Sequence, residues 1–216
     1  MKELTELEYL RKNYSIPNYI KKDMLRYCIV TDNKYLFENL KEHNKEYELD
    51  YLYQLLNKEK ITIKDILKIQ EIVCIGTNVK TGFRNIKVKI WKNKIPIYKF
   101  KKELDRLLNL FYSSNSDIFS RLALFHLFFE DIHPFRDGNG RTCRVIMDIE
   151  LLKHGYPIFA KNSKKYYEAF IEYKDNNNVI KMKEYLINEV YENMIDLKNL
   201  NILINKEEVK YLWKRK

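Results

Sequence analysis

The sequence predicts a mostly α-helical bundle with one small β-hairpin, and three observations carry this prediction. Apolar residues recur every three or four positions along most of the chain, which is the spacing of amphipathic helices. Residues 86–90 alternate between apolar and polar side chains, as a strand does. A glycine-containing loop near residue 138 separates the most apolar segment, 122–129, from another helical pattern at 145–153.

The first part of the chain is predicted to form polar, amphipathic helices that are interrupted early by Pro17. Apolar positions at helical spacing are Leu36, Leu40, Tyr47, Tyr51, Leu52, Leu55 and Leu56. We expect residues 1–60 to be a helical extension packed on the core. Residues 61–200 are expected to form the core itself, and residues 201–216 a C-terminal tail.

The core is predicted to begin with a helix at 62–73, for which Thr62 is a suitable N-cap. After a turn-rich break, Ile86, Val88 and Ile90 form one strand, residues 92–94 turn, and residues 95–98 return. Pro96 has no backbone donor, so the returning strand should lie at a sheet edge. Such a hairpin either clips the fold together or docks a partner segment by strand addition.

The remaining helices are predicted at 99–112, 117–131, 140–153, 163–174 and 179–197. The helix at 117–131 is apolar almost all round and should be buried on most sides. His126 lies on this helix and is expected to be a hydrogen-bonded core residue rather than a ligand. Gly155 and Pro157 are suited to end the helix at 140–153.

Composition narrows the classes of function. The 216 residues are enough for a sizeable core, and the formal net charge is +10. Basic proteins often bind nucleic acid, but the lysines here are spread along the whole chain, so we do not expect nucleic-acid binding as the main function. No apolar run reaches membrane-spanning length, and no membrane partner is expected.

The cysteines and the N-terminus bear on localisation. Cys28, Cys74 and Cys143 are far apart and form neither a disulfide framework nor a metal-binding pair, which fits a reducing compartment. The first residues are charged and lack an apolar signal core. We therefore expect a cytoplasmic protein, with export by a route that uses no cleavable signal left open.

The loop between the two apolar segments holds residue types that suit phosphate chemistry. Gly138 and Gly140 can adopt backbone angles that turn consecutive N–H groups inward, at the start of a helix, where anions bind. Arg141 and Arg144 project from one face of that helix's first turn, where an anionic ligand would offset their conflict with the helix dipole.

Two further side chains complete the set. Asp137 offers the hard oxygen ligand that Mg²⁺ takes when phosphates fill the rest of its shell. His133 can accept a proton near neutral pH. Together with the glycines and arginines, these residues predict a phosphate-ester transfer site.

Two other interpretations of these residues are weaker. Cys143 and His133 could act as nucleophile and base, but Cys143 is followed closely by apolar residues, which favours a buried and inert thiol. His126, Asp131, His133 and Asp137 could bind a transition metal, but their spacing matches no familiar metal site.

The string HPFRDGNGRTCR, from His133 to Arg144, resembles the HxFx(D/E)GNGRxxR signature of Fic-domain proteins at every fixed position. Thr81-Gly82-Phe83-Arg84, with the hairpin after it, resembles more loosely the stretch that leads into the Fic flap. The segment at 163–169 is weakly similar to the one that borders the adenine. The resemblance implies a Fic-type helical bundle with the flap near the active site and residues 61–200 as its catalytic core.

The resemblance also implies an activity, that of a protein adenylyltransferase. Such an enzyme transfers AMP from ATP, with Mg²⁺, to a Tyr, Thr or Ser hydroxyl of a target protein and releases pyrophosphate. By this resemblance His133 is the general base and Asp137 the metal ligand. The implied phosphate-binding residues are Gly138, Asn139, Gly140, Arg141 and Arg144, and the implied target-docking flap residues are Lys87, Val88, Lys89 and Ile90.

Relatives with a lysine in place of Gly140 bind the nucleotide the other way round and transfer phosphate, so the resemblance favours AMP transfer here. Two alternatives stay open. The chain could transfer a different phosphate-containing group, or be a non-catalytic module of the same shape that binds nucleotide or nucleic acid.

Many Fic proteins carry a self-inhibiting helix whose glutamate pairs with the second motif arginine, here Arg144. Segments 34–39 and 188–193 each keep the Glu-Asn pair of that helix but lack its Ser or Thr. We therefore hypothesise that Glu38 or Glu192 restrains ATP binding. Otherwise the enzyme is unrestrained, or a separate inhibitory partner restrains it.

Overall fold

The computed structural model describes residues 2–32, 45–90, 93–95, 99–159 and 164–207. The helices in these ranges are α1 (Lys2–Asn13), α2 (Asn18–Asp32), α4 (Lys45–Leu55), α5 (Ile63–Val73), α6 (Phe100–Ser113), α7 (Ile118–Ile132), α8 (Asn139–Lys153), α9 (Lys164–Asn176) and α10 (Ile180–Asn199). The short strands are β1 (Tyr14–Ser15), β2 (Val88–Ile90), β3 (Asn93–Ile95) and β4 (Ile204–Asn205). A mostly α-helical bundle was predicted, and that prediction is confirmed.

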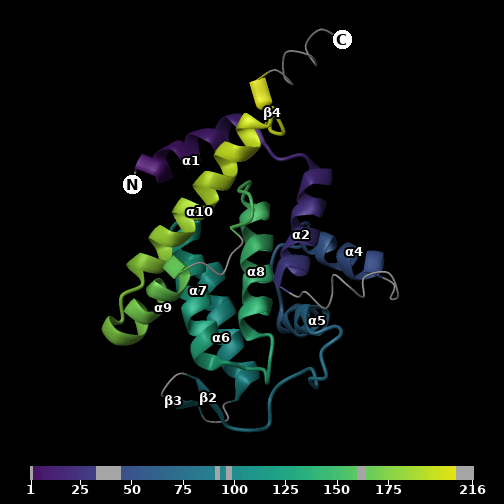
Figure 1. Ribbon diagram of the computed structural model, residues 1–216, viewed down its shortest axis with the longest axis vertical. Helices are drawn as coiled ribbons and strands as arrows, with labels where there is room; N and C mark the ends of the chain where they lie inside the picture. The colour runs from purple at the N-terminus through teal and green to yellow at the C-terminus, as the bar shows by residue number, and fades with distance from the viewer. Residues whose placement is uncertain (1, 33–44, 91–92, 96–98, 160–163, 208–216) are drawn as a thin grey trace.

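Helix α8 lies at the centre of the bundle (Figure 1). It packs against α2, α5 and α7, and every residue from 145 to 152 is buried. Two of these buried residues carry carboxylates, and both have partners. Asp148 accepts hydrogen bonds from the Phe159 N–H and from Cys28 Sγ, and Glu150 accepts one of 2.9 Å from the Tyr112 hydroxyl. The central helix is thereby fixed to the segments around it by polar bonds as well as by packing.

Helix starts follow from local capping. Thr62 caps α5 in a capping box with Asp65, in which each side chain accepts from the other residue's backbone N–H. Asp117 caps α7 by accepting from the Ser120 N–H at 3.0 Å. The C-terminal end of α8 is also determined locally, because Gly155 takes the left-handed conformation (φ 82°) in which helices commonly end.

The N-terminal helices pack on the rest of the chain, α1 against α10 and α2 against α8. The described residues also contain a second sheet, which the sequence did not predict. In it, Tyr14 pairs with Asn205 and Ser15 with Ile204. Ile204 and Asn205 lie within the stretch predicted as a tail and here connect it to the first loop, while residues 208–216 lie outside the described part of the chain.

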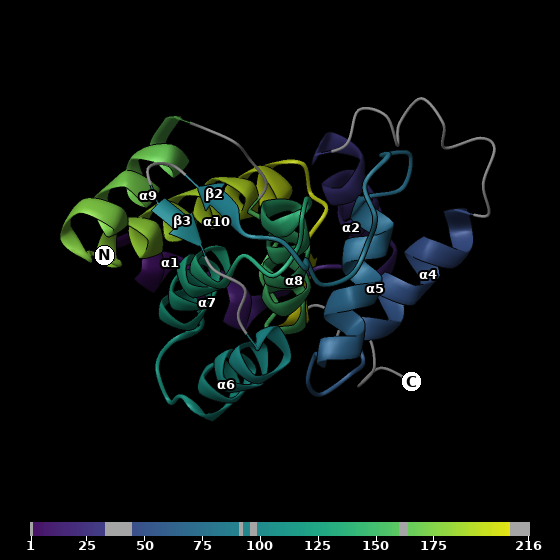
Figure 2. The same ribbon diagram turned by 90° about the horizontal axis from the view of Figure 1, so that it is seen from below.

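The hairpin is present with a register different from the expected one. Val88 pairs with Ile95 and Ile90 with Asn93, so the returning strand is 93–95 rather than 95–98. Residues 96–98, which include Pro96, lie outside the described part of the chain. Seen from below, the hairpin lies at the end of the bundle where α7 leads into α8 (Figures 1 and 2).

Candidate active site

The loop from His133 to Gly138 connects the end of α7 to the start of α8, and it reverses the chain within six residues. His133 (φ 44°, ψ 63°) and Gly138 (φ 81°, ψ 7°) both adopt the left-handed conformation. For a histidine this conformation is uncommon, so contacts elsewhere in the loop must hold it in place.

The side chain of Asn139 closes this loop. Its Oδ1 accepts from the Phe135 N–H at 2.9 Å, and its Nδ2 donates to the Phe135 carbonyl at 3.0 Å. Asn139 was predicted to bind phosphate. Its side-chain amide is occupied by the loop, so only its backbone N–H is available for that role. That N–H is one of the first groups of α8, which lack acceptors within the helix.

A second anchor comes from the segment before the hairpin. Phe83 forms an isolated β-bridge with Phe135, and their rings are stacked at 5.9 Å. Arg84 is buried; its N–H donates to the Pro134 carbonyl at 2.9 Å and its Nε to the His133 carbonyl at 2.7 Å. The residues that lead into the flap therefore hold the backbone of the predicted base.

Gln70 also organises the loop, and no pattern in the sequence distinguishes it from any other helical residue. It is fully buried on α5. Its Nε2 donates to the Asp137 carbonyl at 3.3 Å, and its Oε1 accepts from the Gly82 N–H at 3.0 Å. Gln70 thus joins α5 to both the motif loop and the segment that leads to the hairpin.

A cavity of about 330 Å³ opens over this loop. The residues that line it are His133, Arg136, Asp137, Gly138, Asn139, Gly140, Arg141 and Arg144 from the motif, Glu130 from α7, and Tyr166, Tyr167 and Phe170 from α9. The structure therefore brings all the predicted motif residues to one cavity. A cavity of this size, with charged groups at one side and aromatic rings at another, suits a small polar ligand that carries a ring.

Arg141 and Asp137 contact each other at the edge of the loop. Arg141 Nη2 lies 2.8 Å from Asp137 Oδ2, and Arg141 Nη1 donates to the Val73 carbonyl at 2.8 Å. The other carboxylate oxygen of Asp137 accepts from the Gly138 N–H at 2.6 Å. The Asp137 side chain is still 46% exposed, so a cation can approach it from the cavity.

Arg144 leads into a buried polar chain behind the cavity. Its Nη1 lies 3.4 Å from the Tyr166 hydroxyl, which is 2.7 Å from His126 Nε2. His126 Nδ1 in turn lies 3.1 Å from Cys143 Sγ. His126 is fully buried, as expected of a core residue, and burial lowers its pKa to about 4. Burial also raises the pKa of the Cys143 thiol, which argues against a thiol nucleophile.

The arrangement at Asp137 fits Mg²⁺ held mainly by a nucleotide. The described residues contain no group of three or more His, Cys, Asp or Glu that could hold a metal ion. Mg²⁺ commonly uses one or two carboxylates together with substrate phosphates, so the single exposed carboxylate of Asp137 is sufficient for that mode. Two members of the alternative metal cluster have other partners: His126 contacts Tyr166 and Cys143, and Asp131 accepts from the Tyr173 hydroxyl at 2.5 Å.

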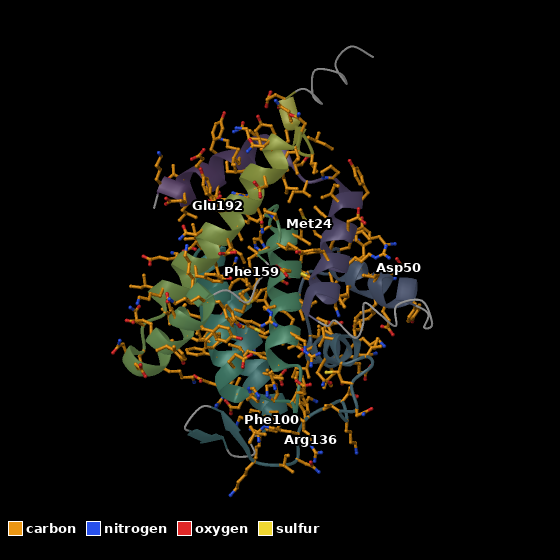
Figure 3. All side chains as sticks on the ribbon, in the orientation of Figure 1. Met24, Asp50, Phe100, Arg136, Phe159 and Glu192 are labelled. Atoms are coloured by element: carbon orange, nitrogen blue, oxygen red, sulfur yellow. The ribbon has the colours of Figure 1, made fainter. Side chains whose placement is uncertain are left out.

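The remaining predicted residues lie away from the cavity or outside the described residues. Lys87 and Val88 enter the hairpin, and the side chains of Lys89 and Ile90 are outside the described part of the structure, as is Glu38. Glu192 is exposed on α10 and does not line the cavity. Figure 3 shows it far from Arg136 and Phe100, which lie at the motif end of the bundle.

The fold and the cavity define a class of protein. It is a helical domain in which His133, at the end of α7, and the glycine-containing loop before the central helix α8 line one cavity. Residues 60–151 match the Fic/DOC family. A relative named protein adenylyltransferase Fic, from Drosophila ananassae, is 30% identical over 155 residues, which is 66% of this chain and 31% of the relative. The chain spans about a third of the length of that relative.

Solved structures show the same fold. A Fic family protein from Desulfovibrio desulfuricans superposes with a TM-score of 0.60 at 18% identity, over 88% of this chain and 67% of that one. A variant of IbpAFic2 in complex with adenylylated Cdc42 gives 0.63 at 16% identity, over 89% and 70% of the two chains. Residues 60–151, which include the motif from His133 to Arg144, therefore form a Fic/DOC family domain.

Proposed function

We propose that this protein is an adenylyltransferase that transfers AMP from ATP to a Tyr, Thr or Ser hydroxyl of another protein. One observation carries the proposal: His133, the glycine bend, both motif arginines and three aromatic rings of α9 line a single cavity. Two comparisons support it. The curated relative is named as a protein adenylyltransferase, and IbpAFic2 has been solved in complex with an adenylylated protein.

In the proposed reaction, His133 takes the proton from the target hydroxyl as that oxygen attacks the α-phosphorus of ATP. The new oxygen–phosphorus bond replaces the bond to the β-phosphate, and pyrophosphate leaves. The backbone N–H groups at the start of α8, with Arg141 and Arg144, hold the phosphates. Tyr166, Tyr167 and Phe170 provide apolar and aromatic surface for the nucleoside.

We propose that Asp137 holds Mg²⁺ together with the phosphates. When bound, Mg²⁺ would neutralise the negative charge that builds on the leaving pyrophosphate. Asp137 would then exchange its contact with Arg141 for the cation, which would allow Arg141 to turn toward a phosphate. Asp137→Asn should therefore raise the Mg²⁺ concentration needed for half-maximal activity, and an unchanged Mg²⁺ requirement would count against this role.

The experiment that tests the function uses ATP labelled on either the α- or the γ-phosphate, incubated with the protein and a cell lysate. We expect protein to be labelled from the α-phosphate only. His133→Ala should lower the rate of labelling by about 10²–10⁴-fold, because it removes the general base. Label from the γ-phosphate alone would indicate phosphate transfer instead. No label from either position would favour a nucleotide-binding module without turnover.

We also propose that the protein acts in a reducing compartment such as the cytoplasm. Cys28, Cys74 and Cys143 are buried, and none of them forms a disulfide among the described residues. Within the described residues, no helix has the length and apolar character needed to cross a membrane. Fractionation of cells that express the tagged chain tests this proposal, and recovery of the chain in an oxidising compartment would refute it.

A further inference from the structure

Glu130 lies one turn before His133 at the end of α7, and the proposed reaction assigns it no role. Its Oε2 is 3.3 Å from His133 Nδ1, and the two side chains are only 16% and 18% exposed. The left-handed conformation of His133 directs the chain out of the helix at this point. The imidazole and the carboxylate thus lie together among the residues that line the cavity.

The carboxylate has the character of an anion despite its burial. Burial alone would raise the pKa of Glu130, but the His133 imidazole 3.3 Å away and the charge of Arg144 hold the pKa below its usual value. The other titratable groups that face it are His126, Cys143 and Tyr166. Among these groups, His126 is neutral above pH 5 or so because its pKa is about 4.

We propose that Glu130 is a positioning residue that keeps the proton of neutral His133 on Nδ1 and leaves Nε2 free to act as the base. This inference rests on the proposed adenylyl transfer. When Nε2 takes the proton of the target hydroxyl, the ring becomes an imidazolium with a proton on each nitrogen. The Glu130 carboxylate, in contact with the Nδ1 proton, stabilises that cation until the proton leaves.

The contact of 3.3 Å is longer than an ideal hydrogen bond, and His133 Nδ1 makes no hydrogen bond within the described part of the chain. Catalytic hydrogen bonds commonly shorten only when substrate is bound. Glu130 Oε1 is buried and likewise lacks a partner among the described residues. The carboxylate therefore has the freedom to turn fully toward the imidazole.

A different role for Glu130 would also be compatible with its position. A Cβ built on Gly140 would lie 3.3 Å from Glu130 Oε1 and 3.0 Å from Arg144 Nη1, so the carboxylate lies beside the bend that would hold phosphate. An anion there could compete with the nucleotide and restrain the enzyme. The two roles predict opposite effects of removing the charge, because a restraint increases activity when it is removed and a positioning residue decreases it.

The first test compares Glu130→Gln with the wild-type protein in the labelled-ATP assay. We expect kcat to fall about 10- to 100-fold, as when an orienting partner is lost, with KM for ATP changed by less than about threefold. In a His133→Ala background, Glu130→Gln should cause no further loss, because the two residues act as one unit. Glu168→Gln is the matched control, since it removes an exposed carboxylate near the cavity whose partner Lys164 is 3.8 Å away.

A rate for Glu130→Gln equal to that of wild type, or above it, would overturn the inference while leaving adenylyl transfer intact. A second measurement does not depend on activity. In protein labelled with ¹⁵N-histidine, the ring nitrogen shifts of neutral His133, assigned with His133→Ala, should report the proton on Nδ1. In Glu130→Leu they should move toward the Nε2–H form that free histidine prefers. An Nε2–H form in the wild-type protein would overturn the inference even if no transfer were ever detected.

Discussion

Gly138→Ala should destabilise the protein through two separable effects. Gly138 has φ 81°, where a side chain strains the backbone, and a Cβ at this position would lie 2.7 Å from Cys74 Sγ. Left-handed strain costs roughly 1–3 kcal/mol, and overpacking of a core contact adds roughly 1–3 kcal/mol. We therefore expect the free energy of unfolding to fall by about 3 kcal/mol, which lowers the melting temperature of a domain of this size by roughly 6–12 °C.

Gly82→Ala is the matched control, because Gly82 has φ 92° but nothing lies within 4 Å of a Cβ built there. It should show the backbone cost alone, about 1 kcal/mol. Thermal and urea unfolding of both variants measure the difference. In a Cys74→Ala background, Gly138→Ala should cost no more than Gly82→Ala does in the wild type. Equal losses for the two glycine variants in the wild type would refute the argument from the Cys74 contact.

Two further predictions concern buried polar groups. Arg84→Ala removes the hydrogen bonds of Arg84 to the carbonyls of His133 and Ile86 (2.7 and 2.5 Å) and its contact with the Phe100 ring, so the free energy of unfolding should fall by about 2–4 kcal/mol. The control is Arg106→Ala, which removes a side chain that is 66% exposed and should change the free energy of unfolding by less than about 0.5 kcal/mol. Comparable urea midpoints for the two variants would contradict this prediction. Burial lowers the pKa of His126 to about 4, whereas the pKa in an unfolded chain is about 6.5. Between these two pH values the unfolded chain binds a proton that the folded protein does not. The free energy of unfolding should therefore fall by up to about 3 kcal/mol as the pH drops from 6.5 toward 4. His126→Gln should flatten that part of the pH–stability curve, and identical slopes for the two proteins would show that other groups control it.

The helices were predictable because their signals are local. Thr62 and Asp117 cap α5 and α7 where the sequence pattern begins, and Gly155 ends α8 where a left-handed residue is needed. The pairing of β1 with β4 was not predictable in this way. It joins two-residue strands that are almost 200 residues apart, and two residues are too few to display a period of two.

The candidate site was predictable as a set of residue types but not as a set of contacts. The motif residues do line one cavity, yet the sequence did not show that the Asn139 side chain closes the loop or that Asp137 contacts Arg141. Gln70 and Glu130 were missed because a polar residue on a helix gives no sign of what it faces. Their roles come from the way α5 and α7 approach the loop, which is a property of the tertiary structure.

The bridge between Phe83 and Phe135 ties the segment before the hairpin to the motif loop. Phe83 and Arg84 contact Phe135, Pro134 and His133 and lead directly to the hairpin, so one short segment holds both the His133 backbone and the start of the hairpin. Under the proposed function, the hairpin sequence, and with it the choice of target, could therefore diverge while the position of the His133 backbone is kept.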